Sequence, residues 1–224
     1  MRITRSSVMF ALGVLIAVGA QNAKATSVLT NGDFETGDLT GWTPFVTSNG
    51  SNGAGLPDVV SFNTTGSGAS LAAHFNVGEV NFTMLPEGGG LSQTFILGAP
   101  GVYSYFANIG SQDDANGINI NSDAGTYSIL IDGTTLASDS LGGFATVNQI
   151  ILATLSGTVS LSAGPHTIEV LITRDFTSLG AETPDEYVDN ISLSSTAPEP
   201  CTFALVALAI VGLAFYRQKL AAAK

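Results

Sequence analysis

Residues 91–107 read Leu-Ser-Gln-Thr-Phe-Ile-Leu, then Gly-Ala-Pro-Gly, then Val-Tyr-Ser-Tyr-Phe-Ala. The outer blocks mix apolar and polar residues with a period near two. Successive side chains of a strand point to opposite faces, so this period is typical of strands with one buried face. Gly, Pro and Ala between the blocks mark a turn. The stretch therefore predicts two strands joined as a hairpin.

Similar patterns recur along the chain. Residues 126–131 and 134–137 flank an Asp-Gly pair, which predicts a second hairpin. Further strands are expected at 28–34, 44–47, 59–62, 71–75, 149–156, 158–162, 166–172 and 187–193. Polar or glycine-rich loops are expected at 48–55, 66–70, 88–90 and 111–125. Since residues 26–197 contain no helical stripe, the pattern predicts an all-β fold, a two-sheet β-sandwich or jelly roll.

Charge excludes some classes of partner. Only 11% of the 224 residues are charged, and residues 26–197 carry 17 acidic side chains against one cation, Arg174, a net charge of −16. Such a surface repels phosphate backbones, so nucleic-acid binding is excluded. Divalent cations and neutral sugars remain compatible with it. One cysteine excludes an intrachain disulfide.

The first 25 residues predict a secretory signal peptide. Arg2 and Arg5 precede an apolar run, and Ala23-Lys24-Ala25 is a small-x-small cleavage site. An uncleaved anchor is the alternative. Export is the expectation, with residues 26–196 as the β-sandwich domain.

The C-terminal segment, residues 197–224, combines three features. Pro198, Glu199 and Pro200 precede an apolar run from Cys201 to Tyr216, and Arg217 opens a basic end. Sixteen helical residues span about 24 Å, slightly less than a bilayer core. We expect a transmembrane helix, and a plain C-terminal anchor is the alternative to the sorting signal described next.

This order of features resembles the PEP-CTERM sorting signal of Gram-negative bacteria. The resemblance implies recognition by an exosortase at Pro198, Glu199 and Pro200, with transient anchoring in the inner membrane. It also implies a place in the cell envelope, on the outer surface or in the extracellular matrix of exopolysaccharide-producing bacteria.

The start of the domain carries a second resemblance. Residues 31–35, Asn-Gly-Asp-Phe-Glu, are followed by Gly41-Trp42, and the domain closes on Val-Asp-Asn-Ile-Ser-Leu at 188–193. These segments, with the central stretch 90–103, are similar to carbohydrate-binding-module jelly rolls. The resemblance implies the fold and favours sugar binding.

Two acidic residues are candidate calcium ligands. If the first and last strands lie side by side, Glu35 and Asp189 come together as hard oxygen ligands. Related modules carry a structural calcium in this region, which favours the assignment. A solvated edge or a pair of turn-forming carboxylates is the alternative.

Three aromatic residues are candidate ligand-binding groups. Tyr103 and Tyr105 share one face of the strand 102–107, where an exposed pair can stack on pyranose rings. Trp42 can cap the core next to Phe34. A core stripe is the competing explanation for the two tyrosines.

No enzyme is expected. His74 and His166 lie in neither a nucleophile elbow nor a metal-binding arrangement. We expect an exported, matrix-associated protein that binds polysaccharide. The alternatives are a passive structural matrix protein without a specific ligand and, further away, a secreted hydrolase with paired carboxylates.

Overall fold

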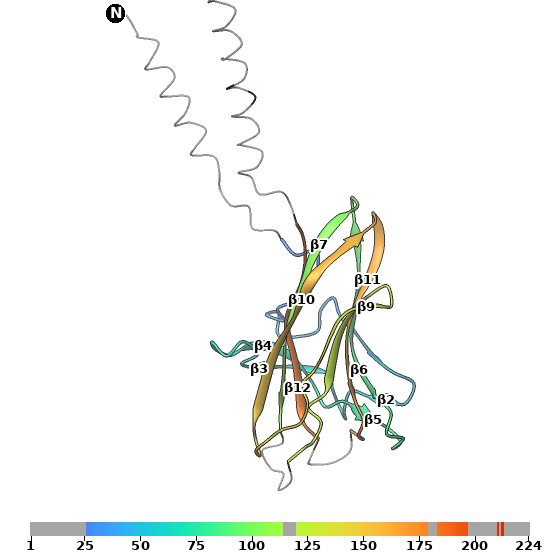
Figure 1. The fold of residues 1–224 in the computed structure, drawn as a ribbon, viewed down its shortest axis with the longest axis vertical. Helices are drawn as coiled ribbons and strands as arrows, with labels where there is room; N and C mark the ends of the chain where they lie inside the picture. Colours follow the sequence, from blue (N-terminus) through green and yellow to red (C-terminus); the bar gives the residue numbers. More distant parts are fainter. Residues whose placement is uncertain (1–25, 114–119, 179–182, 197–209, 211, 213–224) are drawn as a thin grey trace, which may run out of the picture. The chain divides into compact units, whose positions relative to one another are not determined.

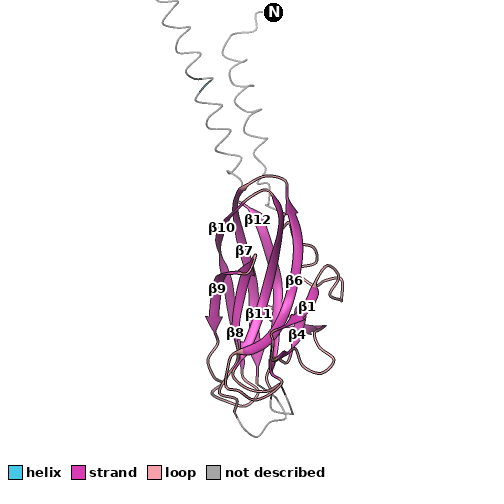
Figure 2. Cartoon of the chain, turned by 90° about the vertical axis from the view of Figure 1, so that its right-hand side faces the viewer, coloured by secondary structure: helices cyan, strands magenta, loops and turns pink. Residues whose placement is uncertain are grey.

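Two antiparallel five-stranded sheets face each other in the computed structural model (Figures 1 and 2). The structure describes residues 26–113, 120–178 and 183–196, together with Ile210 and Gly212. The first sheet has the order β1 (Thr43–Val46), β6 (Glu87–Leu97), β11 (Gly164–Arg174), β8 (Thr126–Ile131) and β9 (Thr134–Ser140). The second has the order β10 (Ile150–Leu161), β7 (Gly101–Gln112), β12 (Asp185–Ser195), β4 (Ser70–Phe75) and β3 (Asp58–Phe62). A small third sheet pairs β2 (Gly50–Ser51) with β5 (Gly78–Glu79). The all-β sandwich expected from the sequence is confirmed.

The core lies between the two five-stranded sheets. Alternate residues of the long strands point inward, as along β11, where His166, Ile168, Val170, Ile172 and Arg174 are buried. The segment before β1 closes one side of this core. There, the rings of Phe34 and Trp42 lie 6.0 Å apart, as the opening motif predicted. The structure thus buries a continuous apolar layer without a disulfide.

The predicted hairpin at 91–107 is wrong. Both strands form, but β6 pairs with β1 and β11, whereas β7 pairs with β10 and β12 in the other sheet. The turn at residues 98–100 therefore carries the chain from one sheet to the other. Alternation of apolar and polar residues indicates which side chains of a strand share a face. It does not indicate whether the next strand in the chain pairs with it in the same sheet or lies in the opposite sheet. The second predicted hairpin is confirmed, because β8 pairs with β9 around Asp132 and Gly133.

Two further expectations need correction. The glycine run 88–90 is part of β6 and not a loop. A Cβ on Gly89 would overlap the side-chain oxygen of Asn52 and lie 2.6 Å from the carbonyl oxygen of Phe45, so glycine permits a close approach. Residues 28–34 form turns and not a strand; this segment is joined to β12 by an isolated bridge between Ser27 and Ser194.

The predicted signal peptide and sorting segment lie outside the described residues, apart from Ile210 and Gly212, which are helical. In the part of the chain that is described, no helix has the length and apolar character to cross a membrane.

We predict that Gly157→Ala destabilises the protein. Gly157 on β10 faces Tyr105 on β7, and an added Cβ would overlap its hydroxyl and lie 2.6 Å from its Cζ. The ring must move, which strains its hydrogen bond to the carbonyl of Leu136. Overpacking of this kind costs about 1–3 kcal/mol, which thermal unfolding measures directly.

Gly101→Ala is the matched control at the start of β7. Its Cβ would meet its nearest atom, Cε2 of Tyr103, at 3.6 Å, an ordinary contact. Equal melting temperatures for the two variants would contradict the packing between β7 and β10 described above.

Candidate functional site

The three aromatic residues expected to bind ligand lie in the core. Tyr103 and Tyr105 are only 7% and 6% exposed, and Trp42 is equally buried. Their polar atoms are used internally: the tyrosine hydroxyls donate to the carbonyls of Ala99 and Leu136, and the indole N–H donates to Asn31. The hypothesis of an exposed tyrosine pair is therefore wrong, and the competing explanation, a core stripe, is confirmed. The outward side chains of β7 belong to the alternate positions, such as Val102 and Phe106.

Glu35 and Asp189 approach the same short stretch of β4. The amide of Leu71 donates to Glu35, and the hydroxyl of the preceding Ser70 donates to Asp189 at 2.6 Å. The segment from Ser27 to Glu35 runs along β12, where Ile191 donates to the carbonyl of Gly32. The proximity of the first and last segments, from which this pair was predicted, is therefore present.

Asp189 lies buried at the bulge in β12. It accepts hydrogen bonds from Ser70, Thr64 and the backbone and side chain of Asn190. Burial raises the pKa of Asp189 and the Glu35 carboxylate adds to this, against the opposing effect of these hydrogen bonds. Two neighbouring carboxylates with hydroxyl oxygens beside them are compatible with a calcium ion.

Histidine, cysteine and carboxylate side chains alone do not complete a metal site here. Within the described ranges, no group of three or more of these residues could hold a metal ion. A calcium ion bound by Glu35 and Asp189 would need hydroxyl or backbone oxygens as further ligands.

The most exposed aromatic surface lies at the end of the sandwich where β11 and β7 finish and β12 begins. We call this the loop end; β2 and β5 lie there, at the bottom of Figure 1. Phe82, which is 59% exposed, and Phe176, which is 38% exposed, present rings with centroids 6.4 Å apart and planes inclined by 19°. We call these two residues the loop-end aromatic pair. The exposed side chains of Val80, Met84 and Leu85 adjoin Phe82 in the sequence.

A buried carboxylate holds the loop that carries Phe82. Glu79 is fully buried at the end of β5 and accepts hydrogen bonds from the amide and hydroxyl of Thr83 and from the amide of Leu85. Burial alone would raise the pKa of Glu79, but these hydrogen bonds lower it below its ordinary value. The side-chain amide of Asn49 adds two hydrogen bonds to the backbone of Asn81: it donates to the Asn81 carbonyl and accepts from the Asn81 amide. The loop is therefore ordered although its apolar side chains face solvent.

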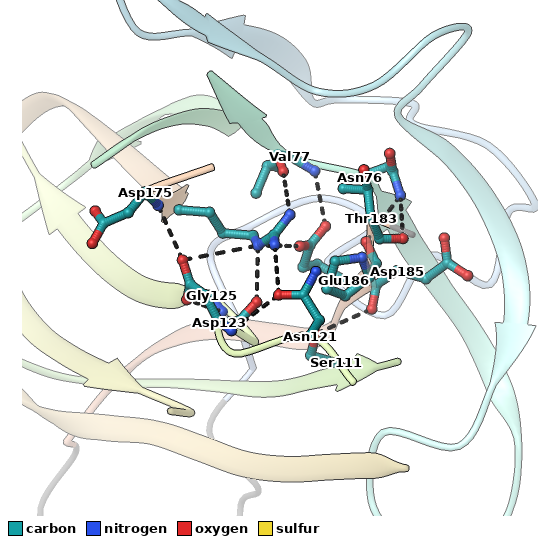
Figure 3. A network of polar contacts seen from close by, with 12 residues as sticks. Asn76, Val77, Ser111, Asn121, Asp123, Gly125, Asp175, Thr183, Asp185 and Glu186 are labelled. Atoms are coloured by element: carbon teal, nitrogen blue, oxygen red, sulfur yellow. Dashed lines mark hydrogen bonds and ion pairs between the residues drawn. The ribbon is translucent and has the colours of Figure 1, made fainter. Parts of the chain in front are cut away.

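The only cation of residues 26–197, Arg174, is buried at the end of β11. Figure 3 shows polar groups that surround it, among them Val77, Asn121, Asp123 and Glu186. Arg174 donates to the carbonyls of Asp123 and Val77 at 3.0 and 3.2 Å and to the side-chain oxygen of Asn121 at 3.0 Å. Its Nε lies 3.8 Å from Glu186, whose other oxygen accepts the amide of Val77 at 2.9 Å. Burial raises the pKa of Glu186 to about 8, although Arg174 opposes this shift.

Both histidines are held in ion pairs. The nitrogens of His74 lie 2.9 and 3.1 Å from Asp58 and Asp185. Burial alone would lower the pKa of His74, but hydrogen bonds to the two aspartates outweigh it and raise the pKa. These contacts join β3, β4 and β12.

The second histidine superficially completes a serine–histidine–aspartate set. Nδ1 of His166 lies 2.6 Å from Asp132, and Nε2 lies 3.5 Å from the Ser162 hydroxyl but only 3.0 Å from the Ser162 carbonyl. The hydrogen bond to Asp132 raises the pKa of His166. Nε2 lies closer to the Ser162 carbonyl than to the Ser162 hydroxyl, so the ring is not aimed at the serine oxygen as a base would be.

The sequence did not predict the loop-end aromatic pair. Phe82 stands in Val-Asn-Phe-Thr-Met-Leu, whose first five residues alternate between apolar and polar like a strand with one buried face. The alternation therefore gave no signal that this segment is a loop with exposed apolar side chains. The burial of Arg174 follows from the even-numbered inward positions of β11, which extend the predicted strand 166–172 by two residues.

Comparisons with known proteins give structural neighbours only. No family model matches the chain, and no curated protein matches it. TmCBM61, a carbohydrate-binding module solved with β-1,4-galactotriose, is 14% identical with a TM-score of 0.42, over 76% of this chain and 99% of the module. A cyclase from Fischerella sp. TAU is 14% identical with a TM-score of 0.45, over 79% of this chain and 100% of the cyclase. A CBM35 from Paenibacillus barcinonensis is 16% identical with a TM-score of 0.32, over 71% of this chain and 96% of the module. Since binding modules and a cyclase both occur among the neighbours, neither a ligand nor an activity follows from them.

Proposed function

We propose that this protein is a non-catalytic polysaccharide-binding protein of the bacterial cell envelope or extracellular matrix, and that it binds through the loop-end aromatic pair. The observation that carries the proposal is the exposure of Phe82 and Phe176 on ordered backbone. Aromatic faces stack on the apolar faces of pyranose rings, and an ordered site loses little conformational entropy on binding.

The proposed ligand is a neutral polysaccharide. Residues 26–197 contain one arginine and no lysine, and that arginine is buried and hydrogen-bonded. His74 and His166 are paired with aspartates. The acidic domain thus offers no free cation to a uronate, sulfate or phosphate group among its described residues, and its net charge repels polyanions.

The non-catalytic part of the proposal rests on the two histidines. His74 pairs with two aspartates and His166 with one, and Nε2 of His166 lies closer to the Ser162 carbonyl than to its hydroxyl. A passive matrix protein without a specific ligand is the competing function.

Calcium is the proposed structural ion. Glu35 and Asp189 would hold it with nearby hydroxyl or backbone oxygens, and it would neutralise the repulsion between the two carboxylates. Its role would be structural: it would fix the segment 27–35 against β12.

Sorting by an exosortase is the proposed route to the envelope. The support is the sequence order of Pro198, Glu199 and Pro200, the apolar run and the basic end. The exosortase and the inner membrane would be partners only during export.

We predict that Phe82→Ala and Phe176→Ala each lower the affinity for a neutral polysaccharide by roughly tenfold, because each removes one stacking face. Binding of residues 26–196 to insoluble cellulose, chitin and β-1,3-glucan measures this, with alginate as the polyanionic comparison. Ile96→Ala, at a 77% exposed apolar position on the outer face of β6, is the control and leaves binding unchanged. Wild-type protein that binds none of the neutral polymers would favour the passive matrix role instead.

Calcium removal is expected to lower the melting temperature. Ion binding to the native state alone stabilises it by about 2.7 kcal/mol at a hundredfold excess over Kd. Thermal scans in calcium and in EDTA test this, and Glu35→Gln is expected to abolish the difference between them. Asp139→Asn, an exposed acid on β9, is the control and keeps the difference. Superimposable scans of the wild type would remove the ion from the proposal.

Intact mass spectrometry of the native protein tests the proposed export route. We expect a chain that starts at Thr26 and ends near Pro198, Glu199 and Pro200. A cytosolic polypeptide with the mass of all 224 residues would contradict both processing steps.

A further inference from the structure

We propose that the buried Arg174–Glu186 pair positions the loop-end aromatic pair, so that Arg174 is a positioning residue for ligand binding. The consequence for binding rests on the function proposed above. The positioning itself concerns the unliganded protein and is tested without a ligand.

The pair binds the backbone of one residue, Val77, on both sides of its Cα. The amide of Val77 donates to Glu186, and the carbonyl of Val77 accepts from Arg174. Val77 is fully buried, and Asn76 before it donates to the carbonyls of Thr183 and Pro184. The entry to β5 is therefore fixed by partners on β11 and β12 (Figure 3).

Phe82 lies five residues after Val77, and hydrogen bonds connect the backbone between them. Gly78 and Glu79 follow directly as β5, and the Glu79 carboxylate holds the amides of Thr83 and Leu85 on either side of Met84. Displacement of Val77 would move this carboxylate and with it the loop that presents Phe82.

Phe176 is tied to the same pair by a second path. It lies two residues after Arg174, and the amide of Asp175 between them donates to Asp123, whose carbonyl accepts from Arg174. The carbonyl of Phe176 in turn accepts the amide of Glu79 at 2.8 Å. Both members of the aromatic pair thus depend on the same guanidinium group.

Arginine suits this position for a geometric reason. Its planar guanidinium donates in three directions at once, to Asp123, Val77 and Asn121. A lysine ammonium keeps the charge but is a compact donor on a flexible stem, so it cannot reproduce this fork. A buried contact between an arginine and a carboxyl group is weak support for stability by itself. Its role in fixing one backbone conformation can be tested separately by experiment.

The test compares Arg174→Lys with Asp132→Asn in the purified full chain. Asp132→Asn breaks the pair with His166, at the opposite end of β11, and serves as the control for general destabilisation. Hydrogen exchange followed by mass spectrometry reports local order without any ligand.

We expect Arg174→Lys to speed exchange about tenfold in the segments 77–85 and 175–178, which corresponds to about 1.4 kcal/mol of local opening. Asp132→Asn is expected to leave these segments unchanged. Cellulose, chitin and β-1,3-glucan binding is expected to fall with Arg174→Lys and to persist with Asp132→Asn. Faster exchange spread evenly over both sheets, or normal binding despite local loosening, would overturn the proposal.

Glu79→Gln keeps the test valid if Arg174→Lys does not fold. This substitution leaves the contact between Arg174 and Glu186 intact. It replaces one of the carboxylate oxygens that accept from Thr83 and Leu85 by an amide nitrogen, so faster hydrogen exchange is expected in residues 80–85 alone. Unchanged exchange there would overturn the path from Val77 to Phe82. If the loops loosen as expected while wild-type protein binds no polysaccharide, the positioning role is supported and the proposed function fails.

Discussion

Burial of one apolar layer between two sheets is the constraint on which this protein depends. A domain with 17 acidic side chains and one cation has few ion pairs to stabilise it, and self-repulsion between like charges opposes the folded state. The long strands meet this constraint by turning every second side chain inward, so that each contributes to both the sheet and the core. The charged residues are left mainly to turns, loops and strand ends.

Four carboxylates are nevertheless fully buried, those of Glu79, Asp113, Glu186 and Asp189, and one oxygen of Glu186 accepts no hydrogen bond. Glu79 is surrounded by donors of its own loop, Asp189 by hydroxyls and the backbone of a bulge, and Glu186 by one amide beside Arg174. An unpaired buried carboxylate is costly, so each of these groups restricts the backbone around it to a conformation that supplies donors. The buried acids therefore order the loops, which apolar packing alone would leave free to vary.

The sequence predicted local features well and pairings between distant strands poorly. The hairpin at Asp132-Gly133 was predictable because a two-residue turn fixes its own strand register. The partners of β6 and β7 were not predictable, because a strand shows the same alternation of apolar and polar residues in either sheet. The same limit explains Tyr103 and Tyr105. Alternation separated them from Val102 and Phe106, but only the position of the opposite sheet decides which set faces inward.

The loop end shows why the site was harder to predict than the fold. Its aromatic rings come from residues 82 and 176, which are brought together by β5 and by the segment after β11. No spacing in the sequence encodes that contact. It requires the bridge from Glu79 to Thr177, the buried carboxylate of Glu79 and the guanidinium of Arg174 together. A single cation placed in the core can order two loops because its donors reach several chain segments at once. The same cation on the surface would be screened by water and would fix neither loop.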